Sequence, residues 1–367
     1  MRRRQGFTLV ELLVAMALIV LIMAIISQAF VEGLETFRQL KGIGDLQEQL
    51  RTATVPLRED LMAQHLVAST GPVKLSQLGP PTNPVIQQGF FRIQQFSGSQ
   101  PESQDSDGIM SSYATDHALL FTINTGAGSS SRRTNFLSVP LQSGGSTTTQ
   151  TALAASGPPN FQDSNLLLSP WAEVAWFLVP MEEPDSTPAN RKYVFAAGGS
   201  TQLFTLHRRI RLLVPNNGPV NATGETSDKI GLYPEVSCKP NPPSSPPGST
   251  IPLYFNSPTD VLNPASRGGM TTDSNNALVI DRTPLGQLQN GVDLTGVDRA
   301  LADVISFQVQ YLTVGSYSFT DVSNGGVYDT AIPPAPTSPQ IRALQITIRV
   351  WDAKTEQTRQ ITMIQDM

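Results

Sequence analysis

Cysteine, histidine and charged residues are scarce in this chain. Of its 367 residues, one is cysteine, three are histidine and 15% are charged. The single cysteine, Cys238, excludes a disulfide within the chain and a metal site built from paired cysteines. It lies in a proline-rich stretch, where we expect an incidental thiol rather than a nucleophile.

Candidate catalytic residues are equally few. The histidines His65, His117 and His207 lie far apart and lack the spacing of metal ligands, so we expect surface or satisfied strand residues. The sequence contains no Gly-x-Ser-x-Gly nucleophile elbow in a strand-to-helix context. We therefore expect a protein that is not an enzyme and needs no cofactor.

The net charge and the polar residues narrow the possible classes of protein further. The formal net charge is −5 at pH 7, and a net acidic chain is a poor default partner for nucleic acid. Polarity is carried mainly by serine, threonine, asparagine and glutamine, alongside 29 prolines and 28 glycines. This composition is typical of a protein rich in strands and loops.

The N-terminus has the pattern of a membrane anchor. Arg2, Arg3 and Arg4 precede an apolar run over residues 7–26, in which only Thr8 and Glu11 are notably polar. The run is long enough to span a membrane as a helix. The basic residues before it predict a cytoplasmic N-terminus. A secretory signal would have a shorter apolar region that ends in small residues.

Glu11 is an expensive residue in this run. An ionised acid within the hydrocarbon costs on the order of 3 kcal/mol, and such acids usually have a partner. Cleavage between Gly6 and Phe7 would supply one, because the new α-amino group of Phe7 would lie one helical turn from Glu11. In a bundle of such helices, the acid of one subunit could equally meet the amine of its neighbour.

The segment GFTLVELLVA, residues 6–15, resembles the class III signal of type IV prepilins and type II secretion pseudopilins. The resemblance implies cleavage after Gly6 by a prepilin peptidase, N-methylation of Phe7 and a role for Glu11 in subunit assembly. The alternative is a plain signal anchor with an accidental glutamate.

Beyond the membrane the helical period continues. Apolar residues recur at steps of three and four from Leu34 to Leu61, so we expect one helix over residues 7–64, of which 7–30 span the membrane. Its first half should meet lipid or other helices, and its second half should pack on a globular domain. Pro56 should kink the helix or end its regular part. Residues 1–6 form the leader.

Residues 65–367 are expected to form a β-rich periplasmic domain, which makes the fold class α+β and pilin-like. Alternating patterns predict strands at 89–96, 118–125, 172–179, 203–214 and 305–311, and a closing hairpin over 344–365. Residues 297–304 are expected to form a short helix. Segments near 126–165, 215–275 and 324–340 are rich in serine, glycine and proline, and we expect disordered surface excursions there.

The segments 304–311 and 339–348 are similar to the minor pseudopilin J group and to pilin-W-type minor pilins. That resemblance implies a subunit of the tip complex of a type II secretion pseudopilus, anchored in the bacterial inner membrane. Its partners would be the prepilin peptidase, other pseudopilins or pilins through the N-terminal helix, the inner-membrane assembly platform and membrane lipid. The alternative is a type IV pilus minor pilin that acts as an adhesin or in DNA uptake.

Two further patterns have residues that could form binding sites. The segment Asp105-Ser106-Asp107-Gly108 resembles a truncated calcium loop, although the later ligands are absent and a polar turn is the simpler interpretation. Arg132, Arg133 and the segment 208–211 carry arginines that could contact DNA. In the second segment, alternation places Arg209 and Arg211 on one strand face, and we expect a solvated sheet face rather than a nucleic-acid site.

Overall fold

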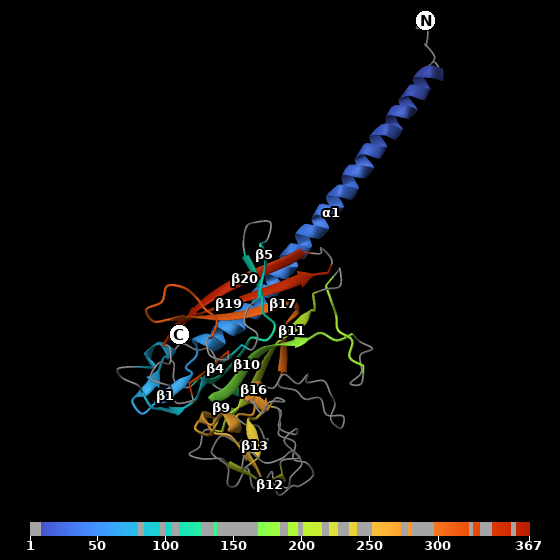
Figure 1. The fold of residues 1–367 in the computed structure, drawn as a ribbon. Helices are drawn as coiled ribbons and strands as arrows, with labels where there is room; N and C mark the ends of the chain where they lie inside the picture. The colour runs from blue at the N-terminus through green and yellow to red at the C-terminus, as the bar shows by residue number, and fades with distance from the viewer. Residues whose placement is uncertain are drawn as a thin grey trace.

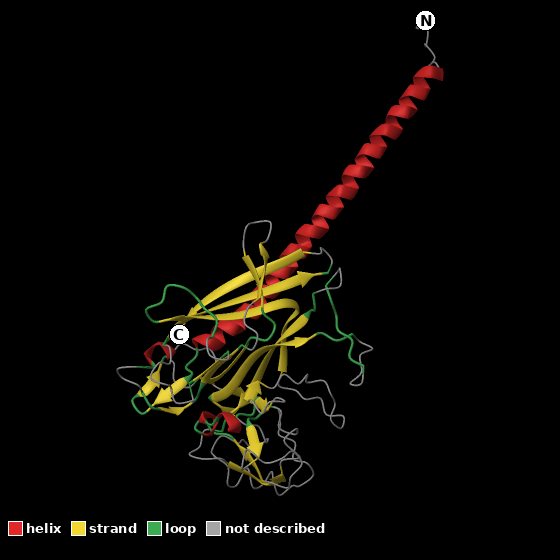
Figure 2. Ribbon diagram, viewed as in Figure 1, coloured by secondary structure: helices red, strands yellow, loops and turns green. Residues whose placement is uncertain are grey.

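One long helix precedes a domain of antiparallel strands (Figure 1), which confirms the predicted α+β pilin-like fold. The computed structural model describes residues 9–79, 84–95, 100–104, 110–125, 136–137, 168–183, 190–196, 201–214, 220–226, 235–240, 252–272, 278–280, 297–322, 326–330, 340–353 and 357–367. Figure 2 shows the C-terminal part of the helix running along the strands and its N-terminal part projecting away from them.

The helix α1 (Leu9–Met62) has 54 residues, a length of about 81 Å at 1.5 Å per residue. Its described bounds lie close to the predicted 7–64. Pro56 does not end it, because the helix continues for more than a turn beyond the proline. Leu57 and Leu61 in these last turns are 0% and 2% exposed, so packing against the domain holds the helix where local propensity is poor.

The domain is built on an eight-stranded sheet in which every pairing between neighbours is antiparallel. In spatial order the strands are β18 (Val327–Asp329), β4 (Phe91–Gln94), β7 (Ala118–Asn124), β10 (Trp171–Pro180), β11 (Phe204–Leu212), β17 (Val297–Thr313), β19 (Ile341–Asp352) and β20 (Gln357–Asp366). The predicted closing hairpin is confirmed by the pairing of β19 with β20, from Ala343 opposite Asp366 to Asp352 opposite Gln357.

The short helix predicted over residues 297–304 is wrong, because these residues form the first half of β17. This half pairs with β11, and the second half pairs with β19. Asp303 lies between the two halves with φ at 54°, a left-handed conformation that aspartate tolerates better than most residues. The pairing with β19 shifts register next to it, between Val304 and Ser306. Pairing with the neighbouring strands β11 and β19 therefore outweighs the local sequence pattern that predicts a helix.

The smaller sheets surround this main sheet. They consist of β1 (Leu66–Ala68), β2 (Gly71–Val73) and β3 (Ile86–Gln88); β12 (Val220–Thr226), β13 (Cys238–Pro240) and β14 (Pro252–Phe255); β15 (Met270–Thr272) and β16 (Leu278–Ile280); β5 (Gln100–Gln104) and β6 (Met110–Tyr113); and β8 (Phe136–Leu137) and β9 (Leu168–Ser169). Three short 3-10 helices, η1 (Leu75–Gln77), η3 (Asp260–Leu262) and η4 (Pro264–Ser266), complete the described elements.

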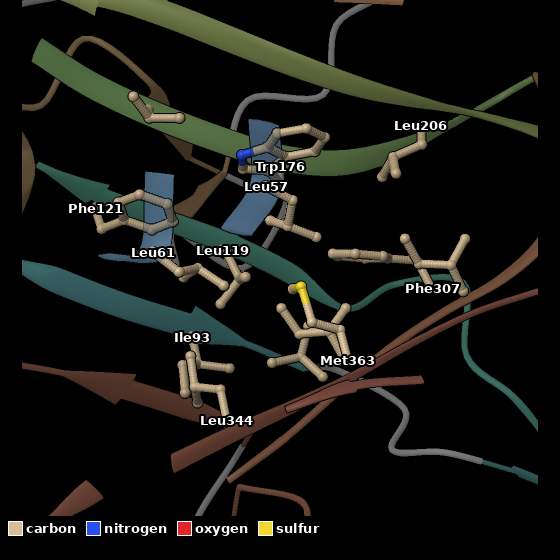
Figure 3. Packing of buried hydrophobic residues seen from close by; sticks show 14 of the residues in the cluster. Leu57, Leu61, Ile93, Leu119, Phe121, Trp176, Leu206, Phe307, Leu344 and Met363 are labelled. Carbon is tan, nitrogen blue, oxygen red and sulfur yellow. The ribbon is translucent and has the colours of Figure 1, made fainter. Parts of the chain in front are cut away.

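One face of the main sheet packs against the C-terminal part of α1. The helix contributes a stripe of side chains that are at most 6% exposed: Leu46, Leu50, Ala53, Leu57 and Leu61. The strands contribute large side chains to the same cluster, among them Phe121, Trp176 and Phe307 (Figure 3). The spacing of the stripe, three or four residues, keeps it on one side of the helix.

The opposite face of the sheet is covered by residues 235–240, 252–272 and 278–280, which we call the capping layer. Val261, Met270 and Ile280 of this layer pack in one cluster with Phe177 and other residues of the sheet. Much of this layer belongs to the segment 215–275, which the sequence predicts to be a disordered excursion. The described residues of the segment are ordered instead. Apolar side chains too few to fold alone become ordered because the sheet offers them a buried surface.

The other two predicted excursions have different outcomes. Residues 326–330, within the segment 324–340, contain β18, which pairs with β4 at the edge of the main sheet, so this part of the segment is ordered. Tyr328 in this strand is 9% exposed. The segment 126–165 lies outside the described residues except for β8.

A buried ion pair fixes α1 to the sheet. Asp60, near the end of the helix, accepts hydrogen bonds from Nη2 and Nε of Arg208 on β11, at 2.6 and 2.7 Å. The indole Nε1 of Trp176 on β10 donates to the same carboxylate at 3.0 Å. The Asp60 side chain is 1% exposed, so its charge is compensated by these donors rather than by water.

Replacing Asp60 tests this attachment. We expect Asp60→Ala to lower the free energy of unfolding by about 3–5 kcal/mol, because it leaves the Arg208 guanidinium buried without its carboxylate. Urea unfolding of the full chain in detergent micelles, followed by tryptophan fluorescence, measures the change. The matched control is Glu59→Ala, at the neighbouring exposed position, and equal destabilisation by both variants would contradict the role of the pair.

Candidate membrane and assembly helix

The predicted processing site adjoins the described part of α1. Arg2, Arg3, Arg4, Gly6 and Phe7 all lie outside the residues that the structure describes. Cleavage between Gly6 and Phe7 and methylation of Phe7 therefore remain predictions from the sequence.

Glu11 lies in the first turn of the described helix and is exposed. Glu11 therefore belongs to the part of α1 that projects away from the domain (Figure 1).

The N-terminal half of α1 is apolar and uncovered. It contains an 18-residue apolar window, none of it buried, and is long and apolar enough to cross a membrane. Its large apolar side chains from residue 9 to residue 40 are 48% to 80% exposed. In the protein these side chains require lipid or other helices around them.

Exposure changes abruptly along the helix. Phe37 and Leu40 are 75% and 61% exposed, whereas Leu46 and Leu50 are 6% and 4% exposed. The period of the sequence extends the packed stripe back to Leu34, but the domain covers α1 only from about Leu46 onward. Residues 31–45 of α1 therefore lie between the predicted membrane span, which ends at residue 30, and the part of the helix that packs on the domain.

The three arginines of β11 do not form the solvated face expected from the sequence, and that prediction is wrong. Alternation is confirmed: Arg208 turns toward α1, whereas Arg209 and Arg211 turn toward the capping layer. Arg209 donates to the carbonyl of Gly269 at 3.0 Å, and Arg211 donates to the carbonyl of Gly268. The residues Arg208 and Arg209 are 7% and 2% exposed, which removes them from contact with a phosphate backbone.

A second buried group of charges joins the capping layer to the edge of the sheet. Asp329 of β18 lies 2.9 Å from Nη1 of Arg92 and accepts two hydrogen bonds from Arg267, at 2.7 and 3.0 Å. The Arg267 guanidinium also lies 3.6 Å from the ring centroid of Phe90. These contacts connect β4 and β18 to the capping layer and stabilise their arrangement.

Glu173 is a buried acid that the sequence analysis did not single out. It lies on β10 opposite Arg211 and is 2% exposed. Burial raises the pKa of its carboxyl, while Arg211, Arg267 and Arg209 act in the opposite direction. Its signal in the sequence is a single acid inside the apolar strand WAEVAWFLVP. An acid at such a position requires basic residues on the neighbouring elements.

His65 and His117 are buried and form hydrogen bonds to backbone groups. Nδ1 of His65 lies 2.7 Å from the carbonyl oxygen of Thr122, and burial lowers the pKa of the ring. Nδ1 of His117 accepts a hydrogen bond from the amide of Val309 at 3.0 Å. The His65 ring therefore lies between β7 and α1, since its Nε2 is also 3.1 Å from the carbonyl oxygen of Leu61, and the His117 ring contacts β17.

The remaining candidate nucleophile and base are not activated. Cys238 is buried in β13, and burial raises the pKa of its thiol to about 12, so the reactive thiolate is suppressed. His207 is partly buried, and desolvation, followed by the charges of Arg299 and Arg209, lowers its pKa to about 4. The expectation of an incidental thiol agrees with this environment, in which Cys238 begins a short strand.

The calcium hypothesis involves Asp105 and Asp107, which lie outside the described residues. Within the part of the chain that the structure describes, no group of three or more histidine, cysteine, aspartate or glutamate side chains is arranged to hold a metal ion.

Replacing Arg209 separates its structural role from a role in binding DNA. We expect Arg209→Ala to destabilise the full chain by about 1.5–3 kcal/mol, because a charged hydrogen bond to the capping layer is lost. Urea unfolding measures this change, and Arg359→Ala, at an exposed position on β20, is the control. Reduced retardation of DNA at low ionic strength, with unchanged stability, would contradict the structural role.

Comparison with known proteins identifies one motif. Residues 1–27 match the prokaryotic N-terminal methylation motif. Comparison with curated proteins and with solved structures gives no match. In prepilin-type proteins this motif implies processing by a prepilin peptidase and assembly with other pilins. Together with the single N-terminal apolar helix, the motif supports a protein of the type IV pilin and pseudopilin class.

Proposed function

We propose that this chain is a structural minor pseudopilin. It is inserted in the bacterial inner membrane, cleaved after Gly6, N-methylated at Phe7 and assembled into the tip complex of a type II secretion pseudopilus. The observation that carries the proposal is the division of α1: its N-terminal half exposes apolar side chains and an acid, while its C-terminal half is docked on the sheet.

The exposed half of α1 has the properties of an assembly element. Before assembly, lipid covers its apolar side chains; in a fibre, the helices of other subunits replace the lipid. Apolarity alone does not favour one helix position over another within a membrane, so polar contacts set the register. Glu11 of one subunit and the Phe7 amine of its neighbour supply such a contact.

The proposed partners follow from this arrangement. They are the prepilin peptidase, an inner-membrane assembly platform and other pseudopilins that bind through the N-terminal helix. The basic leader favours a cytoplasmic N-terminus, which places the β-rich domain in the periplasm. The proposed work is mechanical, with no enzymatic step.

The finer placement in the J group of minor pseudopilins is also a proposal. Support comes from the segments that carry the resemblance, because 304–311 lies in β17 and 339–348 lies mainly in β19. These two strands pair with each other, and β20 follows as the closing strand.

Affinity capture of a tagged full chain from cross-linked membranes, with mass spectrometry of the captured proteins, tests the secretion role. Recovery with other small pseudopilins and a secretion platform supports the proposal. Recovery with a major pilin and a retraction motor would assign the chain instead to a type IV pilus. Recovery of the chain alone would contradict its assembly into any fibre.

Substitution at the cleavage position tests processing. We expect Gly6→Val to abolish cleavage, because a branched side chain does not fit where the glycine carries only hydrogen. The shift in mass between precursor and mature chain, measured in membranes, reports the outcome. Gln5→Val is the control, and cleavage of Gly6→Val at the wild-type rate would exclude this glycine from the processing site.

Substitution of the acid tests assembly. We expect Glu11→Ala to be inserted and cleaved normally but to enter the fibre fraction about tenfold less, the effect of losing one polar contact between helices. Quantitative blotting of sheared fibres against membranes measures the ratio. Glu32→Ala, at an exposed acid beyond the membrane span, is the matched control. Normal incorporation of Glu11→Ala would refute the role of this acid.

A further inference from the structure

The first half of β17 has one edge that no described strand covers. On one side of β17, residues 297–304 pair with β11; on the other side, residues 304–313 pair with β19. β19 ends at Asp352, and the chain returns as β20. Within the part of the chain that the structure describes, the side of residues 297–303 that faces away from β11 therefore has no paired strand.

This open edge carries backbone groups that can form hydrogen bonds. Alternate residues of an antiparallel strand direct their N–H and C=O groups to opposite sides of the strand, so about half of these groups in residues 297–303 point away from β11. Asp303, with its left-handed backbone, lies where β17 leaves β19, because the register shift with β19 is next to it. An open edge of this kind is a template for a further strand.

A groove of about 550 Å³ runs along the open edge. Five consecutive residues of β17, 299–303, line it. Successive side chains of a strand point to opposite faces of the sheet, so a groove that touches all five follows the edge of the strand rather than one face. The helix α1 forms the opposite wall with Asp45, Glu48, Gln49 and Thr52. The occupant that fits a sheet edge within a groove is an extended peptide.

The groove carries an excess of negative charge. Its lining includes the carboxylates of Asp45, Glu48 and Asp303 and one guanidinium, that of Arg299. Burial, followed by the nearby carboxylate of Asp352, raises the pKa of Asp303, so a cation beside Asp303 would relieve an unfavourable charge. The charges of the groove therefore favour an occupant with basic side chains.

We propose that the groove binds an extended, basic segment of a different protein as an added strand. The segment pairs antiparallel with residues 299–303 of β17, in line with β19, and its basic side chains contact the acids of the groove. Backbone pairing supplies the affinity, and the basic side chains supply the selectivity.

A second copy of this chain fits the groove less well, because it carries the same net charge of −5. The inference goes beyond the proposed function, since the contact requires neither cleavage after Gly6 nor the uncovered half of α1. Its test therefore does not depend on fibre assembly.

Binding of a synthetic peptide tests the contact. The probe is a fluorescein-labelled Lys-Val-Lys-Val-Lys peptide with an amidated end, in which an extended backbone places all three lysines on one face. Fluorescence anisotropy follows its titration with the full chain in detergent micelles at low ionic strength. We expect saturable binding of the probe and at least tenfold weaker binding of Glu-Val-Glu-Val-Glu. Equal binding of the two peptides, or an equal signal from empty micelles, would overturn the proposal.

Two N-methylated versions of the probe separate strand pairing from charge. One version is methylated at the lysine amides and the other at the valine amides, and both keep the charge of the probe. Only one of these two sets of amides faces β17 in an added strand. We expect one version to bind like the probe and the other about tenfold more weakly, the effect of losing two or three hydrogen bonds. Equal affinities of the two versions would contradict strand pairing.

Charge reversal on α1 tests whether the probe binds in the groove. We expect Glu48→Lys to weaken binding of the probe about tenfold, because an attraction becomes a repulsion. The matched control, Glu59→Lys, makes the same change at an exposed position of the same helix outside the groove lining, and it should bind like the original chain. Equal affinities of the two variants would overturn the groove as the binding site.

A second copy as the occupant would give a different result. The probe would not bind, two differently tagged copies of the full chain would co-purify from micelles, and Glu48→Lys would separate them. That result would assign the groove to a second copy and overturn the proposal.

Discussion

The contact of Asp60 with Arg208 and Trp176 fixes the helix to the domain, and the rest of the arrangement depends on it. The carboxylate joins the last turns of α1 to two central strands of the sheet. Breaking one side of a buried ion pair leaves an uncompensated charge, so the contact specifies one position of the helix on the sheet. That position determines which residues of α1 are buried and which remain uncovered.

The two faces of the main sheet have different partners. One face receives the apolar stripe of α1, and the other holds the capping layer through Arg209, Arg211 and the network around Asp329. These arginines are engaged within the fold, which explains why a net acidic chain keeps several basic residues in its core. The part of α1 that the domain leaves uncovered is the surface through which we propose that the chain assembles.

Much of the architecture follows from the sequence because it depends on local periodicity. The helix, the alternating strands and the closing hairpin of β19 and β20 are all predicted within a few residues. The strand at 297–304 was missed because its pairing partners lie far away in the sequence. The burial of Arg209 was missed because nothing local shows that the capping layer covers its face. The motif at residues 6–11 marks Glu11, whereas the start of the docked part at Leu46 depends on tertiary contact between the helix and the sheet.

Accessibility along α1 tests the central claim most directly. Single cysteines placed at Val31, Leu34, Phe37, Leu46, Leu50 and Leu57 in a Cys238→Ser chain would be labelled with a membrane-impermeant thiol reagent, in membranes and in sheared fibres. The account predicts that positions 46, 50 and 57 are protected in both states. Positions 31, 34 and 37 should react in membranes and become protected in fibres. Equal reactivity of positions 31, 34 and 37 in the two states would contradict a helix that assembles through its uncovered half.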